Sequence, residues 1–316
     1  MKAVVALVLV ILFNLFAFNR AIGKITFASD REGNWEIYVI NDDGSDPRNL
    51  TRNPADDRHP SWSPDGKHIV FQTNRDRKMG WQLYIMDSDG SNLQRLTKDM
   101  FRDYKEPSWS PDGRRIALIG SGRKGNWDVY MMDMESKDIK RITDLHPDSA
   151  SNPRWSPDGR KIVFERGIGG VGIEIWMMDV EKGNLIRLTK IPPKTHMWFF
   201  NPVWSPRGDK ILYFKTFGRT SLMMMDVKDK RHREILSLPG EIWIPGCSWS
   251  PSGDRIVFTN FNYDLCLFDL KSNKMIDIIT SGGNNVDPDW WGRYAAVRPL
   301  NLLNTFWSLI KRGEIK

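Results

Sequence analysis

The 316 residues carry 46 Lys and Arg against 39 Asp and Glu, a net charge of +7, and 40% of them are hydrophobic, which is the composition of a folded chain and excludes intrinsic disorder. Basic and acidic residues alternate along the whole length, whereas nucleic-acid-binding proteins concentrate basic charge in one stripe, so no nucleic-acid partner is expected. The 14 Trp, 18 Pro and 25 Gly indicate short strands joined by many turns.

The N-terminal segment predicts export. Lys2 precedes an apolar run over residues 3–18, and Ala21 and Gly23 supply the small residues expected at a signal-peptidase site. We therefore expect a signal peptide over residues 1–23 and a periplasmic or secreted protein. An uncleaved membrane anchor is the alternative, because the run is near the lower limit for spanning a bilayer, and only then would the protein contact a membrane.

The charge of the exported chain is mild. Removing Lys2 and Arg20 with the signal segment leaves 7 − 2 = +5. This excess favours anionic partners only weakly, and acidic glycans or a cell-envelope surface fit it better than DNA.

A repeat of about 45 residues organises the rest of the chain, and this period is typical of four-stranded propeller blades. Its marker is Trp-Ser-Pro-Asp-Gly, preceded two residues earlier by Pro in most copies. Full copies begin at Pro60, Pro107, Pro153, Pro202 and Cys247, and a shortened copy begins at Pro288. Pro presets the turn, Asp or Ser bonds to its backbone, and Gly takes a positive φ, so the marker predicts a hairpin.

The remaining columns predict the other strands of each unit. A short apolar strand after the turn starts at Ile25, Ile69, Ile116, Ile162, Ile211 and Ile256. A strand that alternates apolar and polar residues starts at Trp35, Trp81, Trp127, Ile173, Thr220 and Tyr263. Most units end in Leu-Thr or a close variant. The marker Trp is large enough to fill the space between neighbouring sheets, which explains much of the Trp content.

These columns predict an all-β fold, a six-bladed β-propeller of four-stranded antiparallel blades over residues 24–297. The first unit lacks the marker, and an orphan copy over residues 287–297 ends the repeat. Pairing of these N- and C-terminal strands would complete one blade and remove two open sheet edges. The tail over residues 298–316 has apolar residues at helical spacing and predicts a short helix that caps the propeller, with a partner or membrane contact as the alternative.

The two cysteines, Cys247 and Cys266, could pair in an oxidising compartment. The repeat places them on the first and third strands of one blade, roughly 10 Å apart, which is too far for a disulfide. We expect both to be small core residues.

The repeat resembles that of the TolB-type six-bladed β-propeller family of exported bacterial proteins. The strongest stretches are residues 27–38 and 86–97, each similar to the family pattern from end to end. The resemblance covers residues 24–297. TolB carries an α/β domain ahead of its propeller, whereas here the repeat starts straight after Gly23. It implies an envelope scaffold that holds other proteins.

A binding face is expected opposite the Trp-Ser-Pro-Asp-Gly turns, because variable loops on a rigid scaffold usually carry binding. These loops cover residues 30–34, 74–80, 121–126, 166–172 and 190–201. The residues that make this face basic are Arg31, Arg75, Arg77, Lys78, Arg123, Lys124, Arg166 and Arg219. Trp198, Phe199 and Phe200 lie in the longest loop and could form a binding hot spot. An ordinary solvated rim, with that loop packed onto the propeller, is the alternative.

Two sets of residues suggest a metal site. The segments 41–46 and 87–91 look like the start of a calcium loop, but neither has the closing Glu, and turn chemistry explains both. His59, His146 and His196 fall in loops on the expected binding face and could meet at a metal, as in the TolB-like oligogalacturonate lyases.

The function expected from the sequence is therefore protein binding. Neither Gly-x-Ser-x-Gly nor His-Glu-x-x-His occurs, so no catalytic residue, metal site or cofactor is predicted. We expect a monomer whose partners are envelope proteins. The alternatives are a metal-assisted polysaccharide lyase and a propeller that binds acidic glycans passively.

Overall fold

A computed structural model of the chain describes residues 23–76, 80–98, 103–121, 125–238, 240, 246–280 and 282–292. These residues form strands and turns without any helix, which confirms the all-β class, and residues 23–292 make one compact unit. None of them forms a helix that could cross a membrane. The predicted signal segment before Gly23 and the predicted tail helix lie outside the described residues.

The strands form antiparallel groups of four, and we call each group a meander. One comprises β24 (Asn285–Trp291), β1 (Lys24–Ser29), β2 (Glu36–Asn41) and β3 (Arg48–Asn49). The next comprises β4 (Asp57–Trp62), β5 (His68–Thr73), β6 (Gln82–Asp87) and β7 (Gln94–Arg95). A third comprises β8 (Tyr104–Trp109), β9 (Arg115–Ser121), β10 (Trp127–Asp133) and β11 (Ile139–Arg141).

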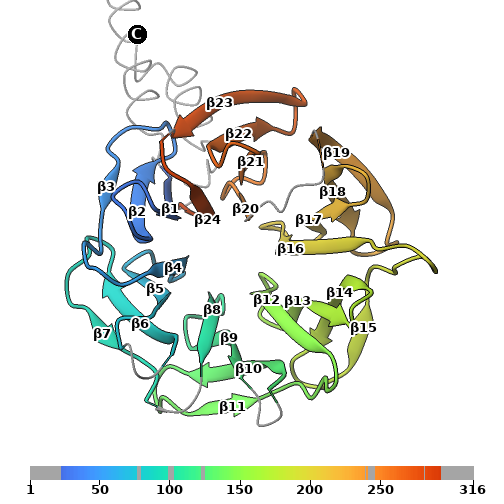
Figure 1. Ribbon diagram of the computed structural model, residues 1–316, viewed down its shortest axis with the longest axis horizontal. Coiled ribbons are helices and arrows are strands. Elements are labelled where there is room, and N and C mark those ends of the chain that lie inside the picture. Colours follow the sequence, from blue (N-terminus) through green and yellow to red (C-terminus); the bar gives the residue numbers. More distant parts are fainter. Residues whose placement is uncertain are drawn as a thin grey trace, which may run out of the picture. The chain divides into compact units, whose positions relative to one another are not determined.

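The remaining meanders follow in chain order. One comprises β12 (Ser149–Trp155), β13 (Lys161–Ile168), β14 (Gly172–Asp179) and β15 (Leu185–Arg187). Another comprises β16 (Trp198–Trp204), β17 (Lys210–Thr216), β18 (Thr220–Asp226) and β19 (His232–Leu238). The last comprises β20 (Cys247–Trp249), β21 (Arg255–Thr259), β22 (Leu265–Asp269) and β23 (Lys274–Thr280). Figure 1 shows the meanders around a common centre, with β4, β8, β12, β16 and β20 nearest to it.

Two pairings join strands that are not consecutive in the chain. Strand β24 pairs with β1, placing Trp290 opposite Ile25 and Trp291 opposite Lys24. A single parallel pair, Ile173 opposite Trp198, joins β14 to β16 and so merges two meanders into one sheet.

The Trp-Ser-Pro-Asp-Gly turn owes its shape to side-chain hydrogen bonds. In the first copy, Ser63 Oγ accepts the backbone N–H of His68 and donates to Asp65 Oδ1 at 2.6 Å, while Gly66 takes φ 71°. The copy at Ser205 has Arg instead of Asp after the Pro, and there Ser205 Oγ donates to Asp209 Oδ1 instead. The turn therefore keeps its acidic acceptor even where the motif varies.

The core lies between meanders, where the marker tryptophans pack. Trp62, for example, packs with Ile37 and Val39 of β2 and with Ile69 and Phe71 of its own meander. Such side chains exclude water between facing sheets, as the sequence predicts. The Leu-Thr columns follow the short outer strands, and Thr97 Oγ1 accepts the backbone N–H of Leu83.

The two cysteines lie where the repeat places them. Cys247 on β20 and Cys266 on β22 both register with Phe258 on the intervening strand. Both thiols are free and buried, which confirms them as small core residues.

Candidate functional site

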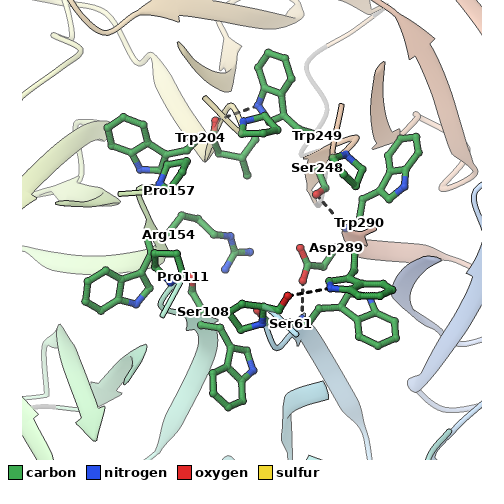
Figure 2. A pocket seen from close by; sticks show the side chains of 18 of the residues that line it. Ser61, Ser108, Pro111, Arg154, Pro157, Trp204, Ser248, Trp249, Asp289 and Trp290 are labelled. Atoms are coloured by element: carbon green, nitrogen blue, oxygen red, sulfur yellow. Dashed lines mark hydrogen bonds between the residues drawn. The ribbon is translucent and has the colours of Figure 1, made fainter. Parts of the chain in front are cut away.

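A cavity of about 410 Å³ opens at the centre of the meanders, on the side of the Trp-Ser-Pro-Asp-Gly turns (Figure 2). We call it the axial pocket. Prolines of the turns lie around it: Pro64, Pro111, Pro157, Pro206 and Pro251. The residues between the repeat's Pro and Trp also line it: Ser61, Ser108, Arg154, Val203, Ser248 and Asp289. The pocket therefore has an apolar rim and a polar interior.

One column of the repeat supplies that polar interior. Successive side chains of a strand point to opposite sides, so when the marker Trp packs between meanders the residue before it faces the axis. The Trp and turn columns are nearly constant, but this column holds hydroxyls, a valine, one cation and one carboxyl group. Its variation gives the pocket distinct chemistry on different sides.

Arg154 and Asp289 are the charged residues of this column, and Figure 2 shows both side chains pointing into the pocket. Asp289 Oδ2 accepts the backbone N–H of Trp62 at 2.7 Å. Burial raises the pKa of Asp289, while that hydrogen bond and Arg154 partly oppose the rise. Among the described residues Arg154 has no carboxylate partner within 4.0 Å, and its Nη1 makes only a 3.4 Å hydrogen bond to Pro153 O. Burial raises the pKa values of four acids, Glu106, Glu165, Asp287 and Asp289, and the charge of Arg154 partly lowers them again. A guanidinium in this position can also form paired hydrogen bonds to a carboxylate ligand.

A bulge before each marker Trp shapes the wall below this column. The residue three positions before the Trp has a positive φ, and the register of most inner strands shifts there. These residues are His59, Glu106, Asn152, Asn201, Gly246 and Asp287. A bulge leaves a backbone N–H without its ladder partner, and such a group needs another acceptor when buried.

Acceptors from the neighbouring meander satisfy three of these N–H groups. Glu106 Oε2 accepts the N–H of Asn152 at 2.6 Å, and Glu165 Oε1 accepts the N–H of Asn201 at 2.7 Å. Gln72 Oε1 likewise accepts the N–H of Glu106 at 2.9 Å. Burial raises the pKa of both Glu106 and Glu165. These two buried acids therefore link neighbouring meanders.

His59 and Asp287 form the corresponding contact between β4 and β24. His59 Nδ1 lies 3.4 Å from Asp287 Oδ1, and their side chains are 18% and 10% exposed. Burial raises the pKa of Asp287 to about 7 and lowers that of His59 to about 4. Both groups are thus driven toward their neutral forms, because removing a charge from water is unfavourable.

The structure does not bring the three candidate histidines together. His59 faces Asp287, whereas His146 and His196 are exposed on other connections. No group of three His, Cys, Asp or Glu side chains in the described part of the chain has metal-binding geometry. In the calcium-like segment 41–46, Asp43 Oδ1 accepts both the N–H and the hydroxyl of Ser45, which are turn contacts.

Three arginines of the predicted binding face make internal contacts. Arg31 lies 4.7 Å from the ring centre of Tyr38 and donates to Asn285 Oδ1 at 2.7 Å. Arg75 and Arg166 repeat this arrangement. Their guanidinium groups lie 4.8 Å from Tyr84 and 4.6 Å from Trp176, and they pair with Asp57 and Asp148. Their stacking and pairing fasten loops to the strands below.

The other predicted face residues divide into three kinds. Arg219 is 59% exposed and pairs with Glu234. Trp198, Phe199 and Phe200 were expected in a loop, and this was wrong: they form the start of β16 and pair with β17. Phe199 and Phe200 are buried, and Trp198 is 43% exposed. Arg77, Lys78, Arg123 and Lys124 lie outside the described residues.

Arg154 and Asp289 are not among the site residues predicted from the sequence. The marker that contains them is explained by turn and packing chemistry, and the predicted binding face is the opposite one. The signal was the column before the Trp, which holds Ser, Arg, Val or Asp in different copies. Alternation along a strand, applied to that column, points it at the axis.

Comparison with known proteins gives a family and a fold. The sequence matches the TolB beta propeller domain over residues 17–121 and 100–260. No curated protein sequence matches the chain. TolB from Acinetobacter baumannii is similar in structure, with a TM-score of 0.72 and 21% identity over 85% of this chain. The match spans 66% of that protein, which is less than two thirds of its length.

Two further structures share the fold. A putative TolB from Agrobacterium tumefaciens has a TM-score of 0.54 and 21% identity, covering 70% of this chain and 91% of that one. An oligogalacturonate lyase in complex with manganese has a TM-score of 0.59 and 13% identity, covering 80% and 73%. At such identities the likeness concerns the fold alone.

Proposed function

This chain belongs to the TolB β-propeller domain family, and from that premise we propose that it is an exported protein-binding scaffold of the cell envelope. The axial pocket is the proposed binding site, and its ligand is an acidic side chain or a terminal carboxylate carried by a partner protein. The export signal expected before Gly23 supports the envelope location.

The scaffold in this proposal is a closed six-bladed propeller. The meanders of residues 23–292 supply the blades, and β24 is the innermost strand of the blade that β1, β2 and β3 complete. The pairing of β24 with β1 and the contact of Trp62 N–H with Asp289 support this closure. Closure matters for function because it holds Asp289, near the end of the repeat, against Trp62 from the start of the repeat and so positions it in the axial pocket.

The observation that carries the proposal is the position of Arg154. Its guanidinium points into a cavity of about 410 Å³ and has no carboxylate partner within 4.0 Å among the described residues. An arginine in such a setting binds carboxylates through paired, charge-assisted hydrogen bonds. The proline and tryptophan rim suits a peptide, because protein interfaces surround a polar contact with apolar, water-excluding groups.

Affinity capture from envelope extract tests this function. Immobilised chain comprising residues 24–316 would be compared with Arg154→Glu and with Arg160→Glu, an exposed arginine of the same Trp-Ser-Pro-Asp-Gly copy. We expect the wild-type chain and the Arg160→Glu variant to retain the same protein, identified by mass spectrometry, and the Arg154→Glu variant to lose it.

Two outcomes would contradict the proposal. Equal capture by all three chains would place binding elsewhere. Displacement of the captured protein by oligogalacturonate, or release of unsaturated sugars from that substrate with manganese present, would favour the glycan-binding or lyase alternative.

A further inference from the structure

A second cavity, of about 440 Å³, lies between the β12–β15 and β16–β19 meanders. We call it the lateral cleft. The β15 side contributes Arg187 and Lys190, and the other meander contributes Phe199, Lys215 and Met223. The connection between the meanders adds Met197. The volume is within the range of small-molecule sites, which run from roughly 300 to 1,000 Å³.

The β16–β19 meander departs from the repeat at this cleft. In three other meanders the third strand carries an aromatic residue beneath a stacked arginine: Tyr38, Tyr84 and Trp176. These residues register with Phe27, Phe71 and Phe164. In the β16–β19 meander the corresponding pair is Tyr213 and Met223, so a slender, flexible side chain replaces the aromatic ring. The volume that a ring and its arginine fill elsewhere is left open.

A fixed polar group occupies the inner wall of this cleft. Tyr213 stands in a column that is otherwise apolar, and its Oη lies 2.7 Å from His232 Nδ1. The two rings meet edge to face at 5.9 Å. Burial lowers the pKa of His232, so the imidazole is neutral at neutral pH and orients the tyrosine without adding charge. Phe199 packs against Tyr213 at 6.0 Å, which gives the wall an aromatic surface.

The rim is strongly cationic. Lys190 is exposed and Lys215 is half-buried, and neither has an acidic partner within 4.0 Å in the described part of the chain. Arg187 Nη1 lies 3.8 Å from Glu174 Oε1, the one ion pair that these three cations form with the described residues. Positive charge on the rim therefore exceeds the negative charge that faces it, and a cleft of one sign attracts ligands of the other.

We propose that the lateral cleft binds a small aromatic anion, with its carboxylate or sulfonate between Lys190 and Lys215 and its ring against Phe199 and Met223. The apolar wall accounts for the ring, because aromatic and methionine side chains pack well on flat ring systems. The two lysines account for the charge. This site is separate from the axial pocket, so it does not depend on the protein-binding function.

Calorimetric titration with three matched probes tests the ligand class: 1-naphthalenesulfonate, neutral 1-naphthalenemethanol and cationic 1-naphthylmethylammonium. We expect the sulfonate to bind most tightly. The double variant Lys190→Glu/Lys215→Glu should bind it about tenfold more weakly or worse, because like charges now face the anion. The control Lys182→Glu/Lys228→Glu reverses two exposed lysines on turns of the same meanders and should bind like the wild type.

The variant Met223→Tyr tests the position of the ring. It restores the aromatic residue that Tyr38 and Tyr84 provide in other meanders, so it should fold with an unchanged melting temperature and lose sulfonate binding. Equal binding of all three probes would overturn the proposal, as would tighter binding of octanoate than of naphthalenesulfonate. Unchanged binding in Met223→Tyr or in the Lys190→Glu/Lys215→Glu variant, or no binding by the wild type, would also overturn it.

Discussion

The imidazole Nδ1 of His59 lies 3.4 Å from Oδ1 of Asp287, and this contact joins an inner strand near the start of the repeat to the inner strand at its end. Both residues sit at bulges, with φ of 50° and 55°. We call the contacts of β24 with its neighbouring strands the seam. Because the pKa values of His59 and Asp287 are displaced in opposite directions, the stability of the seam depends on pH.

The signs of the two contributions differ. Asp287 holds its proton more tightly when folded, because burial raises its pKa from 3.8 to about 7. Its stabilising contribution is complete below about pH 4 and is lost as the pH rises to about 7. His59, with its pKa lowered from 6.5 to about 4, binds its proton less tightly when folded, so its contribution improves as the pH rises over that range.

Asp287→Asn should therefore change the pH profile. Asn keeps the acceptor oxygen but does not ionise, so it removes the loss of stability that Asp287 causes as the pH rises. The variant should therefore gain stability relative to the wild type between about pH 4 and 7. A shift of one pKa unit corresponds to about 1.4 kcal/mol, so the gain should reach a few kcal/mol. Urea unfolding at a series of pH values measures it. Parallel curves for the two proteins would contradict the assignment.

Arg75 should be structural, although it was predicted on a binding face. Its Nη2 pairs with Asp57, whose side chain is fully buried. Arg75→Ala should cost about 3–5 kcal/mol of unfolding free energy, because it leaves a buried charge unpaired. The matched change Arg219→Ala, in an exposed pair, should cost about 1 kcal/mol or less. Chemical unfolding compares them, and similar losses would show that burial of Asp57 does not decide the effect.

Gly66 and Gly113 allow a test of the seam between β24 and its neighbours. Both have φ 71° in equivalent turns, so an Ala at either position carries the same backbone strain, about 1–2 kcal/mol. A Cβ on Gly66 would lie 2.1 Å from Trp291, whereas one on Gly113 would meet only Pro64 at 3.9 Å. Gly66→Ala should therefore destabilise the protein by about 1–3 kcal/mol more than Gly113→Ala does, which is the usual cost of overpacking. Equal melting temperatures would mean that Trp291 does not pack there.

The two thiols should be unreactive until the protein unfolds. Burial raises the pKa of Cys247 to about 12, and both cysteines lie in the core around Phe258. Ellman's reagent should label neither in the native protein and both in denaturant. Fewer than two labelled thiols after denaturation without reductant would reveal a disulfide, which the strand between them argues against.

The strands and turns were predictable because their causes are local. Trp-Ser-Pro-Asp-Gly sets its own turn through contacts within a few residues, as between Ser63 and Asp65, and alternation fixes which side of a strand is buried. Trp198 and Phe199 were wrongly predicted to lie in a loop, because the inner strands continue past a bulge that no local motif predicts. There, pairing with β17 decides the conformation.

The sequence by itself determined the all-β class, the TolB-type repeat and the position of both cysteines, since each depends on periodicity or on contacts along one meander. Only the tertiary structure decided which charged side chains are free to contact a ligand. The sequence predicts Arg75 and Arg166 as exposed cations, yet aromatic rings and acidic side chains contact them. Arg154, by contrast, belongs to a turn motif and points into a cavity. The reason is physical: whether a charge is free depends on which side chains from other meanders surround it, and the sequence of one meander does not contain that information.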